Sequence, residues 1–223
     1  MNPPHFIFNR FFIYALVYCY DTAGYLFTNH LNWRHPTEFN LNAIDLWIPF
    51  LPMTGWIYVS VYLMPFVAMI CVREQKLIRA QIFSFLLAPT LAFMIFFIYP
   101  TCYPRPPLES GGVGNMALAM VYGLDAPSNA WPSLHVVYAF LTCYFVGLTH
   151  PRWGKVILLW AVGVSVSTLT TKQHYFNDVI AGLVFSYGVF RYALHRYAIP
   201  QSVSSITTGG AAKSQSSNNS TAG

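Results

Sequence analysis

The sequence predicts an all-α membrane protein, a bundle of six transmembrane helices. Three observations carry this prediction: charged residues make up 9% of the 223 residues, hydrophobic residues reach 55%, and three stretches longer than 20 residues carry no formal charge. A soluble domain has about a quarter charged residues, so this chain has too few to cover a water-exposed surface. The same composition excludes a disordered chain, a collagen-like chain and a disulfide-rich miniprotein.

The charge-free stretches place the helices, because about 20 apolar residues are needed to cross a bilayer. Residues 46–72, 80–104 and 126–151 contain no Asp, Glu, Lys or Arg. In chain order, the expected spans are roughly 11–29, 53–72, 81–99, 133–150, 155–171 and 177–195. They form one membrane domain over residues 1–200, and its first apolar run is a retained span rather than a cleaved signal peptide.

Two segments fall outside the spans. Residues 100–132 form the longest loop, rich in proline at its start, and Met116 to Tyr122 within it is apolar enough for a short interfacial helix. After Pro200 the composition changes to Ser, Thr, Asn, Gly and Ala. Such a segment cannot bury a core, so residues 201–223 are predicted to be a disordered tail on the cytoplasmic side.

The lysines and arginines predict the orientation in the membrane. One side holds nine of them, namely Arg10, Arg73, Lys76, Arg79, Arg152, Lys155, Arg191, Arg196 and Lys213, and the other side holds Arg34, Arg105 and Lys172. The richer side is cytoplasmic by the positive-inside rule, so both termini lie there. The loops that carry Arg105 and Lys172 therefore face the periplasm, the exterior or an organelle lumen. The basic residues form no run with interleaved aromatics, so no nucleic-acid partner is expected.

Three polar clusters interrupt the apolar pattern, and all three fall on the non-cytoplasmic side. The first is Arg105 between two prolines, the second is Ser133 with His135 at the start of the fourth span, and the third runs from Lys172 to Asp178. The hydroxyl of Ser133 lies near the free N–H groups of a helix N-terminus, which is a favourable place for an anion. The clusters together predict a site for a negatively charged group.

His174 and Asp178 are four residues apart, so on a continuous helix they share one face. Asp178 then accepts from one imidazole nitrogen and leaves the other nucleophilic, as in a catalytic triad. Two histidines and one aspartate also match a metal triad, but the further carboxylate or third histidine of a hydrolytic site is missing. Taken alone, each residue also fits a polar group that merely faces lipid headgroups. No metal and no cofactor is predicted.

The string YPRPP, then PSLHVVYAF, then STLTTKQHYFNDVIAG resembles the type 2 phosphatidic acid phosphatase superfamily of lipid phosphate phosphatases over about residues 45–195. It is most similar to the branch that includes inositol phosphorylceramide synthases. The Pro-Ser-x-His signature of the superfamily is matched by Pro132, Ser133 and His135, and its Ser-Arg-x5-His-x3-Asp signature by Ser167, His174 and Asp178. Two cations of the signatures are replaced, since Ile98 stands for a lysine and Thr168 for an arginine.

This resemblance implies the six-helix fold of the superfamily and a metal-independent enzyme. It implies that His174 attacks phosphorus to form a phosphohistidine, that Asp178 orients and supports it, and that His135 protonates the leaving alcohol. Arg105 and Ser133 would hold the phosphoryl oxygens, and Lys172 would replace part of the missing charge. The substrate would be a phosphorylated lipid or a phospholipid.

Three functions remain open at this level. Water attack on the phosphohistidine makes the protein a lipid phosphatase, whereas attack by a lipid alcohol makes it a phospho-headgroup transferase. A site with fewer cations suits a phosphodiester, which carries one negative charge less than a monoester, and this favours the transferase. A catalytically silent transporter or scaffold that keeps the fold is the third, and the sequence leaves the oligomeric state open.

Overall fold

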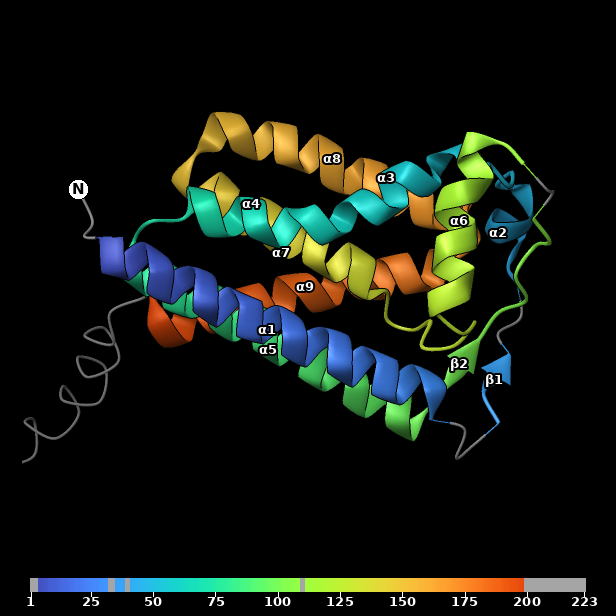
Figure 1. The fold of residues 1–223 in the computed structure, drawn as a ribbon, viewed down its shortest axis with the longest axis horizontal. Coiled ribbons are helices and arrows are strands. Elements are labelled where there is room, and N and C mark those ends of the chain that lie inside the picture. The colour runs from blue at the N-terminus through green and yellow to red at the C-terminus, as the bar shows by residue number, and fades with distance from the viewer. Residues whose placement is uncertain (1–3, 32–34, 39–40, 109–110, 199–223) are drawn as a thin grey trace, which may run out of the picture.

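The computed structural model describes residues 4–31, 35–38, 41–108 and 111–198, with side chains from residue 10 onward. The tail predicted at 201–223 lies outside these residues, as do Arg34 and Lys213. In chain order, the elements are α1 (Pro4–His30), β1 (Thr37–Glu38), α2 (Ala43–Trp47), η1 (Pro52–Thr54), α3 (Gly55–Val59), η2 (Ser60–Leu63), α4 (Met64–Cys71), α5 (Gln75–Ile98), β2 (Thr101–Cys102), α6 (Val113–Leu124), α7 (Leu134–Thr149), α8 (Pro151–Thr170) and α9 (Phe176–Tyr197) (Figure 1).

The described chain is mostly helical, as predicted, and every expected span falls on a helix or on a run of consecutive helices. Within the described residues, three helical stretches are long and apolar enough to cross a membrane: Pro52–Cys71, Gln75–Ile98 and Pro151–Thr170. The helices α6 and α7 are apolar but shorter. Length and composition therefore identify an integral membrane protein and three of its expected spans. The short helix expected at 116–122 is confirmed as α6.

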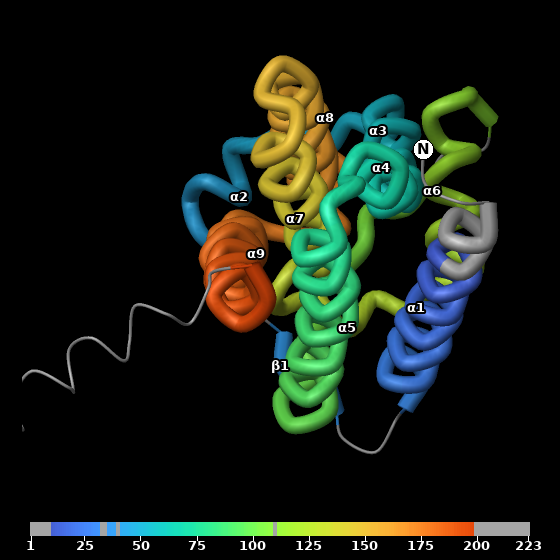
Figure 2. The backbone as a smooth tube through the Cα atoms, turned by 90° about the vertical axis from the view of Figure 1, so that its left-hand side faces the viewer, coloured from blue at the N-terminus to red at the C-terminus, as the bar shows by residue number. Residues whose placement is uncertain are grey.

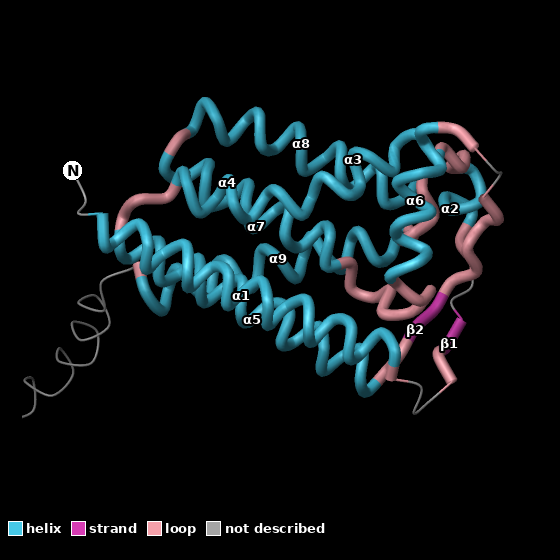
Figure 3. The backbone as a smooth tube through the Cα atoms, in the orientation of Figure 1, coloured by secondary structure: helices cyan, strands magenta, loops and turns pink. Residues whose placement is uncertain are grey.

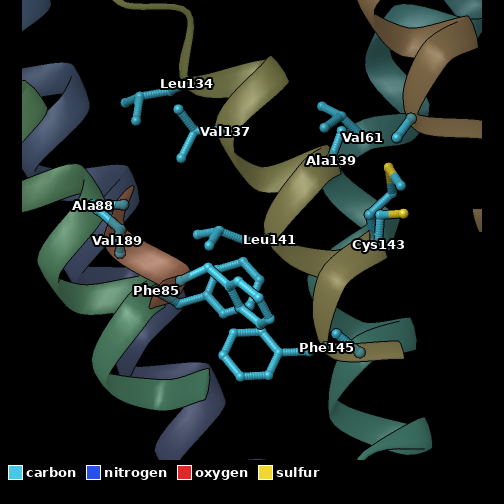
Figure 4. Packing of buried hydrophobic residues seen from close by; sticks show 14 of the residues in the cluster. Val61, Phe85, Ala88, Leu134, Val137, Ala139, Leu141, Cys143, Phe145 and Val189 are labelled. Carbon is cyan, nitrogen blue, oxygen red and sulfur yellow. The ribbon is translucent and has the colours of Figure 1, made fainter. Parts of the chain in front are cut away.

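Helix α7 lies at the centre of the bundle. It packs against α4, α5, α8 and α9, and Figure 2 shows it surrounded by these helices, with α1 at the outside beside α5. Its side chains Val137, Leu141 and Phe145 have no exposed surface. Figure 4 shows Leu141 pointing toward Phe85 of α5. Lipid is as apolar as these side chains, so close van der Waals packing, rather than removal of the side chains from water, holds the surrounding helices against α7.

The span predicted at 53–72 is not one regular α-helix, because it alternates between 3-10 and α geometry from η1 to α4. Pro65 has no N–H to donate to a carbonyl in the preceding turn, so residues 60–63 tighten into a 3-10 turn before it. Within that turn, the Ser60 hydroxyl donates to the Ile57 carbonyl at 2.6 Å and accepts from the Trp160 indole at 2.8 Å. The hydroxyl of Ser60 and the indole of Trp160 in α8 thus stabilise the interruption of the helix.

The two short strands lie at one end of the bundle, together with α2, α6 and the loops that join them (Figure 3). Strands β1 and β2 are parallel, with Thr37 opposite Thr101. The sequence analysis did not predict them, since two residues are too few to show an alternating pattern. At the opposite end, Arg10 donates to the carbonyls of Met69 and Val72, which joins the start of α1 to the end of α4. The three polar clusters of the sequence lie at the end of the bundle that carries β1, β2, α2 and α6.

Candidate active site

The turn between α8 and α9 sets the position of His174. Lys172 adopts a left-handed backbone with φ of 56°, which folds the chain back on the end of α8. The backbone N–H groups of Gln173 and His174 then both donate to the Thr168 carbonyl at 3.1 Å. These bonds satisfy a carbonyl that the helix end leaves free and hold His174 against the bundle. Its side chain is buried, with 6% of its surface exposed.

Ser133 begins α7 as its N-cap. Its buried hydroxyl oxygen accepts from the Val136 N–H at 3.4 Å, and its own N–H donates to the Asp178 carbonyl at 3.3 Å. This second bond joins the start of α7 to the start of α9. Gly182 permits the close approach, because a Cβ there would lie 2.9 Å from the Ser133 carbonyl oxygen. The contact between the two helix starts brings the second and third polar clusters together.

The two histidines of these clusters face each other. Nε2 of His174 lies 3.4 Å from Nδ1 of His135, and Nδ1 of His174 lies 2.9 Å from the Ala130 carbonyl oxygen. A carbonyl only accepts, so Nδ1 of His174 carries the proton in the neutral ring and Nε2 keeps its lone pair. The lone pair of His174 is therefore directed toward His135, whose Nδ1 donates to it.

His135 is held by aromatic rings on its other sides. Its ring stacks on Tyr58 with centroids 4.2 Å apart and meets the edge of Tyr62 at 5.8 Å. Its Nε2 is buried and has no hydrogen-bond partner. With Nδ1 protonated, Nε2 is an unsatisfied acceptor, which is costly unless a ligand or a water donates to it.

Asp178 lies on the far side of His174 from His135. One carboxylate oxygen accepts from the Tyr103 hydroxyl at 2.8 Å, and the other accepts from the Tyr175 N–H at 2.8 Å and lies 3.6 Å from Nδ1 of His174. Asp178 therefore acts on His174 through charge, while the Ala130 carbonyl takes the hydrogen bond expected of the aspartate. Burial and the Asp178 charge both raise the pKa of the Tyr103 phenol, which keeps it a donor.

Arg105 and Lys172 face this group from the loops. The Arg105 guanidinium pairs with Asp125 at 3.0 Å, also donates to the Asp125 carbonyl, and lies 4.7 Å from the centre of the Tyr122 ring. The Lys172 ammonium donates to the carbonyls of Asp45 and Ile48 at 2.8 and 2.6 Å. Lys172 thus ties the segment around α2 to the site, and partial burial lowers the pKa of its ammonium.

Two cavities meet at these residues. The first, here called the polar pocket, has a volume of about 20 Å³ and is lined in part by Arg105, Asp125, Lys172 and His174. The second, here called the apolar cavity, measures about 390 Å³. It lies between α1, η2, α6 and α7, and its walls include Tyr62, Val121, Leu134, His135 and Tyr138. Tyr25 and Asp125 line both, so the cavities adjoin, with His174 on one and His135 on the other.

Besides Asp125, a second carboxylate lies in the wall of the apolar cavity. Asp21 of α1 lines it and accepts from the Tyr138 hydroxyl of α7. The structure pairs it with Tyr138, one turn further along α7 than His135.

The geometry thus joins a facing histidine pair, a buried carboxylate and an arginine at the meeting point of a polar and an apolar cavity. A family model described as the PAP2 superfamily matches residues 28–192, well over half of the chain. The chain belongs to the PAP2 superfamily. No curated protein sequence matches it. Superfamily membership and the apolar helices identify a membrane enzyme of the phosphatase type, which the sequence analysis expected.

The chain departs from the superfamily signatures at Ile98 and Thr168. Ile98 is 61% exposed at the end of α5, and Thr168 is buried with its hydroxyl donating to the Ser165 carbonyl. Neither residue lines the polar pocket, where Arg105 and Lys172 supply the positive charge. An exposed isoleucine and a threonine that hydrogen-bonds within its own helix thus stand where the signatures have cations.

The sequence analysis missed three residues of the site: Tyr103, Asp125 and the carbonyl of Ala130. Asp125 left a usable signal, because it is one of two acids in the loop 100–132 and follows directly on the apolar segment of α6. A buried acid in a loop with Arg105 suggests an ion pair. The Tyr103 hydroxyl and the Ala130 carbonyl left no such signal, since backbone carbonyls and tyrosines occur throughout the chain.

Proposed function

We propose that this protein transfers or hydrolyses the phosphoester of a membrane lipid through a phosphohistidine formed on His174. The observation that carries the proposal is the His174–His135 pair at the junction of the two cavities. A phospholipid has a charged head and an apolar body, and the adjoining polar and apolar cavities match that division. The buried, unpaired Nε2 of His135 suits the oxygen of the lipid alcohol.

The chemistry follows from the positions of the two rings. His174 attacks phosphorus through Nε2, since Nδ1 donates to the Ala130 carbonyl. The phosphorus–oxygen bond to the lipid alcohol breaks, and His135, protonated for this step, gives its proton to the leaving oxygen. Asp178 stabilises the positive charge that develops on His174. Arg105, Lys172 and the α7 N-terminus at Ser133 stabilise the phosphoryl oxygens.

The second step releases the phosphoryl group from His174. His135 is unprotonated after the first step and accepts the proton of the attacking hydroxyl. Water as the nucleophile completes hydrolysis, and a lipid alcohol in the apolar cavity completes headgroup transfer. The volume of the apolar cavity favours the second possibility, because a lipid alcohol fits where the first one left. This is the reaction type of the inositol phosphorylceramide synthase-like branch.

The reaction as proposed needs no metal ion. Asp178 and His135 lie at opposite nitrogens of the His174 ring, so one cation cannot be bound by all three side chains. Among the described residues, no three His, Cys, Asp or Glu side chains come together as a set of metal ligands. The positive charge that phosphoryl transfer requires comes from Arg105, Lys172 and the helix N-terminus instead.

A panel of lipids tests the function. Purified protein in detergent is incubated with phosphatidate, with phospholipids of different headgroups and with lipid alcohols as acceptors, in the presence of a chelator. We expect release of the lipid alcohol in the first step. Free phosphate as the second product would indicate hydrolysis, and a new headgroup-bearing lipid would indicate transfer. If folded protein forms neither product from any lipid, the catalytically silent transporter or scaffold remains as the function. Loss of activity in the chelator, restored by a divalent ion, would contradict the metal-free mechanism.

We further propose that α1, the run from η1 to α4, and α5, α7, α8 and α9 are six spans, with both termini in the cytoplasm. The basic residues counted in the sequence support this orientation. The end of α9 and the start of α1 lie at the same end of the bundle, away from the site (Figure 1). The site then faces the periplasm, the exterior or a lumen.

The orientation predicts that Cys102 reacts with a membrane-impermeant thiol reagent in intact cells or right-side-out vesicles. Burial and the Glu38 charge raise the pKa of the Cys102 thiol, so labelling should increase as the pH rises to 8.5 and above. Unfolded protein and the Cys102→Ser variant are the positive and negative controls. Labelling that requires permeabilised membranes would reverse the proposed orientation.

A further inference from the structure

Asp125 stands where a phosphoryl group is expected to bind. It lines the polar pocket together with His174, and its carboxylate takes the Arg105 guanidinium at 3.0 Å. The same guanidinium donates to the backbone carbonyl of Asp125 and to that of Ala126 at 3.4 Å. The pocket is narrow, at about 20 Å³, so a group that binds Arg105 there comes close to the Asp125 carboxylate. A phosphoryl group bound by Arg105 therefore lies beside the carboxylate of Asp125.

A second contact holds Asp125 at the site. Its other carboxylate oxygen accepts from the Tyr25 hydroxyl of α1 at 2.9 Å, so the residue is held from a second side. Its side chain is 16% exposed, which limits the water that can screen its charge. A bound phosphoryl group thus has a carboxylate as its neighbour.

The formal charges of the residues that line the polar pocket sum to one positive charge. Among the residues that line it, Arg105 and Lys172 bring two positive charges and Asp125 brings one negative charge. One positive charge remains, which balances the single charge of a phosphodiester. A phosphomonoester carries between 1.5 and 2 negative charges at pH 7, because its second pKa is about 6.

We propose that Asp125 is a specificity-determining residue, which repels the second negative charge of a phosphomonoester and so makes the site select phosphodiester lipids over lipid phosphates. This inference rests on the proposed function and names the substrate class of that site. The repulsion between unit charges a few ångströms apart at a protein boundary corresponds to roughly 10–100-fold in selectivity. Loss of the Asp125 charge is therefore expected to raise the activity toward the monoester more than the activity toward the diester.

The test compares phosphatidate with phosphatidylmethanol of the same acyl chains, which differ by one methyl group and one charge. Both release diacylglycerol in the first step, so kcat/KM for diacylglycerol release is measured for each. In Asp125→Asn, the monoester-to-diester ratio should rise roughly 10–100-fold above that of the wild-type protein. Asp125→Glu keeps the charge and should keep the wild-type ratio. Glu74→Gln removes an exposed carboxylate at the start of α5 and should also leave the ratio unchanged.

A pH series supplies a second readout that needs no variant. The groups that face Asp125 are Arg105, Tyr25, Tyr58, Tyr62 and His174. Lowering the pH from 7.5 to 5.5 turns the monoester into a monoanion, and burial raises the pKa of Asp125 so that it also moves toward neutrality. Both changes relieve the repulsion, so the wild-type ratio should rise as the pH falls.

The outcomes separate the two proposals. A wild-type protein that prefers the monoester, or an unchanged ratio in Asp125→Asn with both activities intact, overturns the role of Asp125 and leaves the function standing. If Asp125→Asn fails to fold, a wild-type ratio that stays flat with pH overturns the role in the same way. If the wild-type protein releases diacylglycerol from neither lipid and forms no phosphoenzyme, the proposed function itself is wrong.

Discussion

His174→Ala is expected to abolish release of the lipid alcohol and formation of a phosphoenzyme. The imidazole supplies the nucleophile, and no neighbouring group replaces it, since His135 approaches the same Nε2 as a donor. Removal of a nucleophile that forms a covalent intermediate costs roughly 10⁴–10⁶-fold in other enzymes. Brief incubation with a phospholipid labelled at phosphorus, followed by denaturation, should trap label on the wild-type protein that is stable in base and lost in acid.

His195→Ala is the matched control for this experiment. His195 is an exposed histidine in the last turn of α9, at the far end of the helix that carries Asp178, and its loss should leave both labelling and turnover unchanged. Label that persists in His174→Ala would place the covalent bond on another residue. Turnover in the wild-type protein without any trapped label, under conditions where the second step is slow, would instead favour direct attack by water.

His135→Ala should separate substrates by their leaving groups. An alkoxide leaving from a lipid has a conjugate acid of high pKa and needs a proton in the transition state, whereas a nitrophenolate leaves without one. The variant should therefore lose roughly 10²–10⁴-fold on an alkyl phosphoester and much less on the matching nitrophenyl ester. Initial rates of leaving-group release measure the first step alone, so slow breakdown of the phosphohistidine does not hide the difference.

Tyr58→Phe is a useful companion, because it keeps the ring that stacks on His135 and removes only the hydroxyl. Any loss of activity in Tyr58→Phe should be the same on the alkyl ester and on the nitrophenyl ester. His174→Ala should lose activity on both esters, since no leaving group replaces an absent nucleophile. Equal losses on the two esters in His135→Ala would remove the general-acid role and leave His135 as a residue that binds phosphate or acts in the second step.

Much of the fold could be predicted because its signals are local. The charge-free stretches correspond to helices, and the apolar segment inside the long loop is α6. The interruption between η1 and α4 could have been anticipated from Pro65, whereas the pairing of β1 with β2 depends on residues more than 60 positions apart. Such a pairing has no local pattern, so it could only be observed.

The site shows the same division. Charge bias and spacing in the sequence predicted that His135, His174 and Asp178 lie on one side of the membrane, and the structure brings the three residues to one end of the bundle. The sequence also predicted the hydrogen bond from His174 to Asp178, but the structure gives that bond to the Ala130 carbonyl and leaves Asp178 at 3.6 Å. Helical spacing predicts which residues share a face and cannot predict which of several acceptors lies nearest.

Composition and motif spacing are properties of the chain, so they were enough to predict a helical membrane enzyme of the PAP2 superfamily with two histidines and an aspartate in its motifs. The folded structure was needed to show that Asp125 pairs with Arg105, that Lys172 donates to carbonyls at α2, and that a polar and an apolar cavity adjoin near the histidines. These contacts join segments far apart in the chain. They arise when α7 packs among α4, α5, α8 and α9, and that packing brings the loops together.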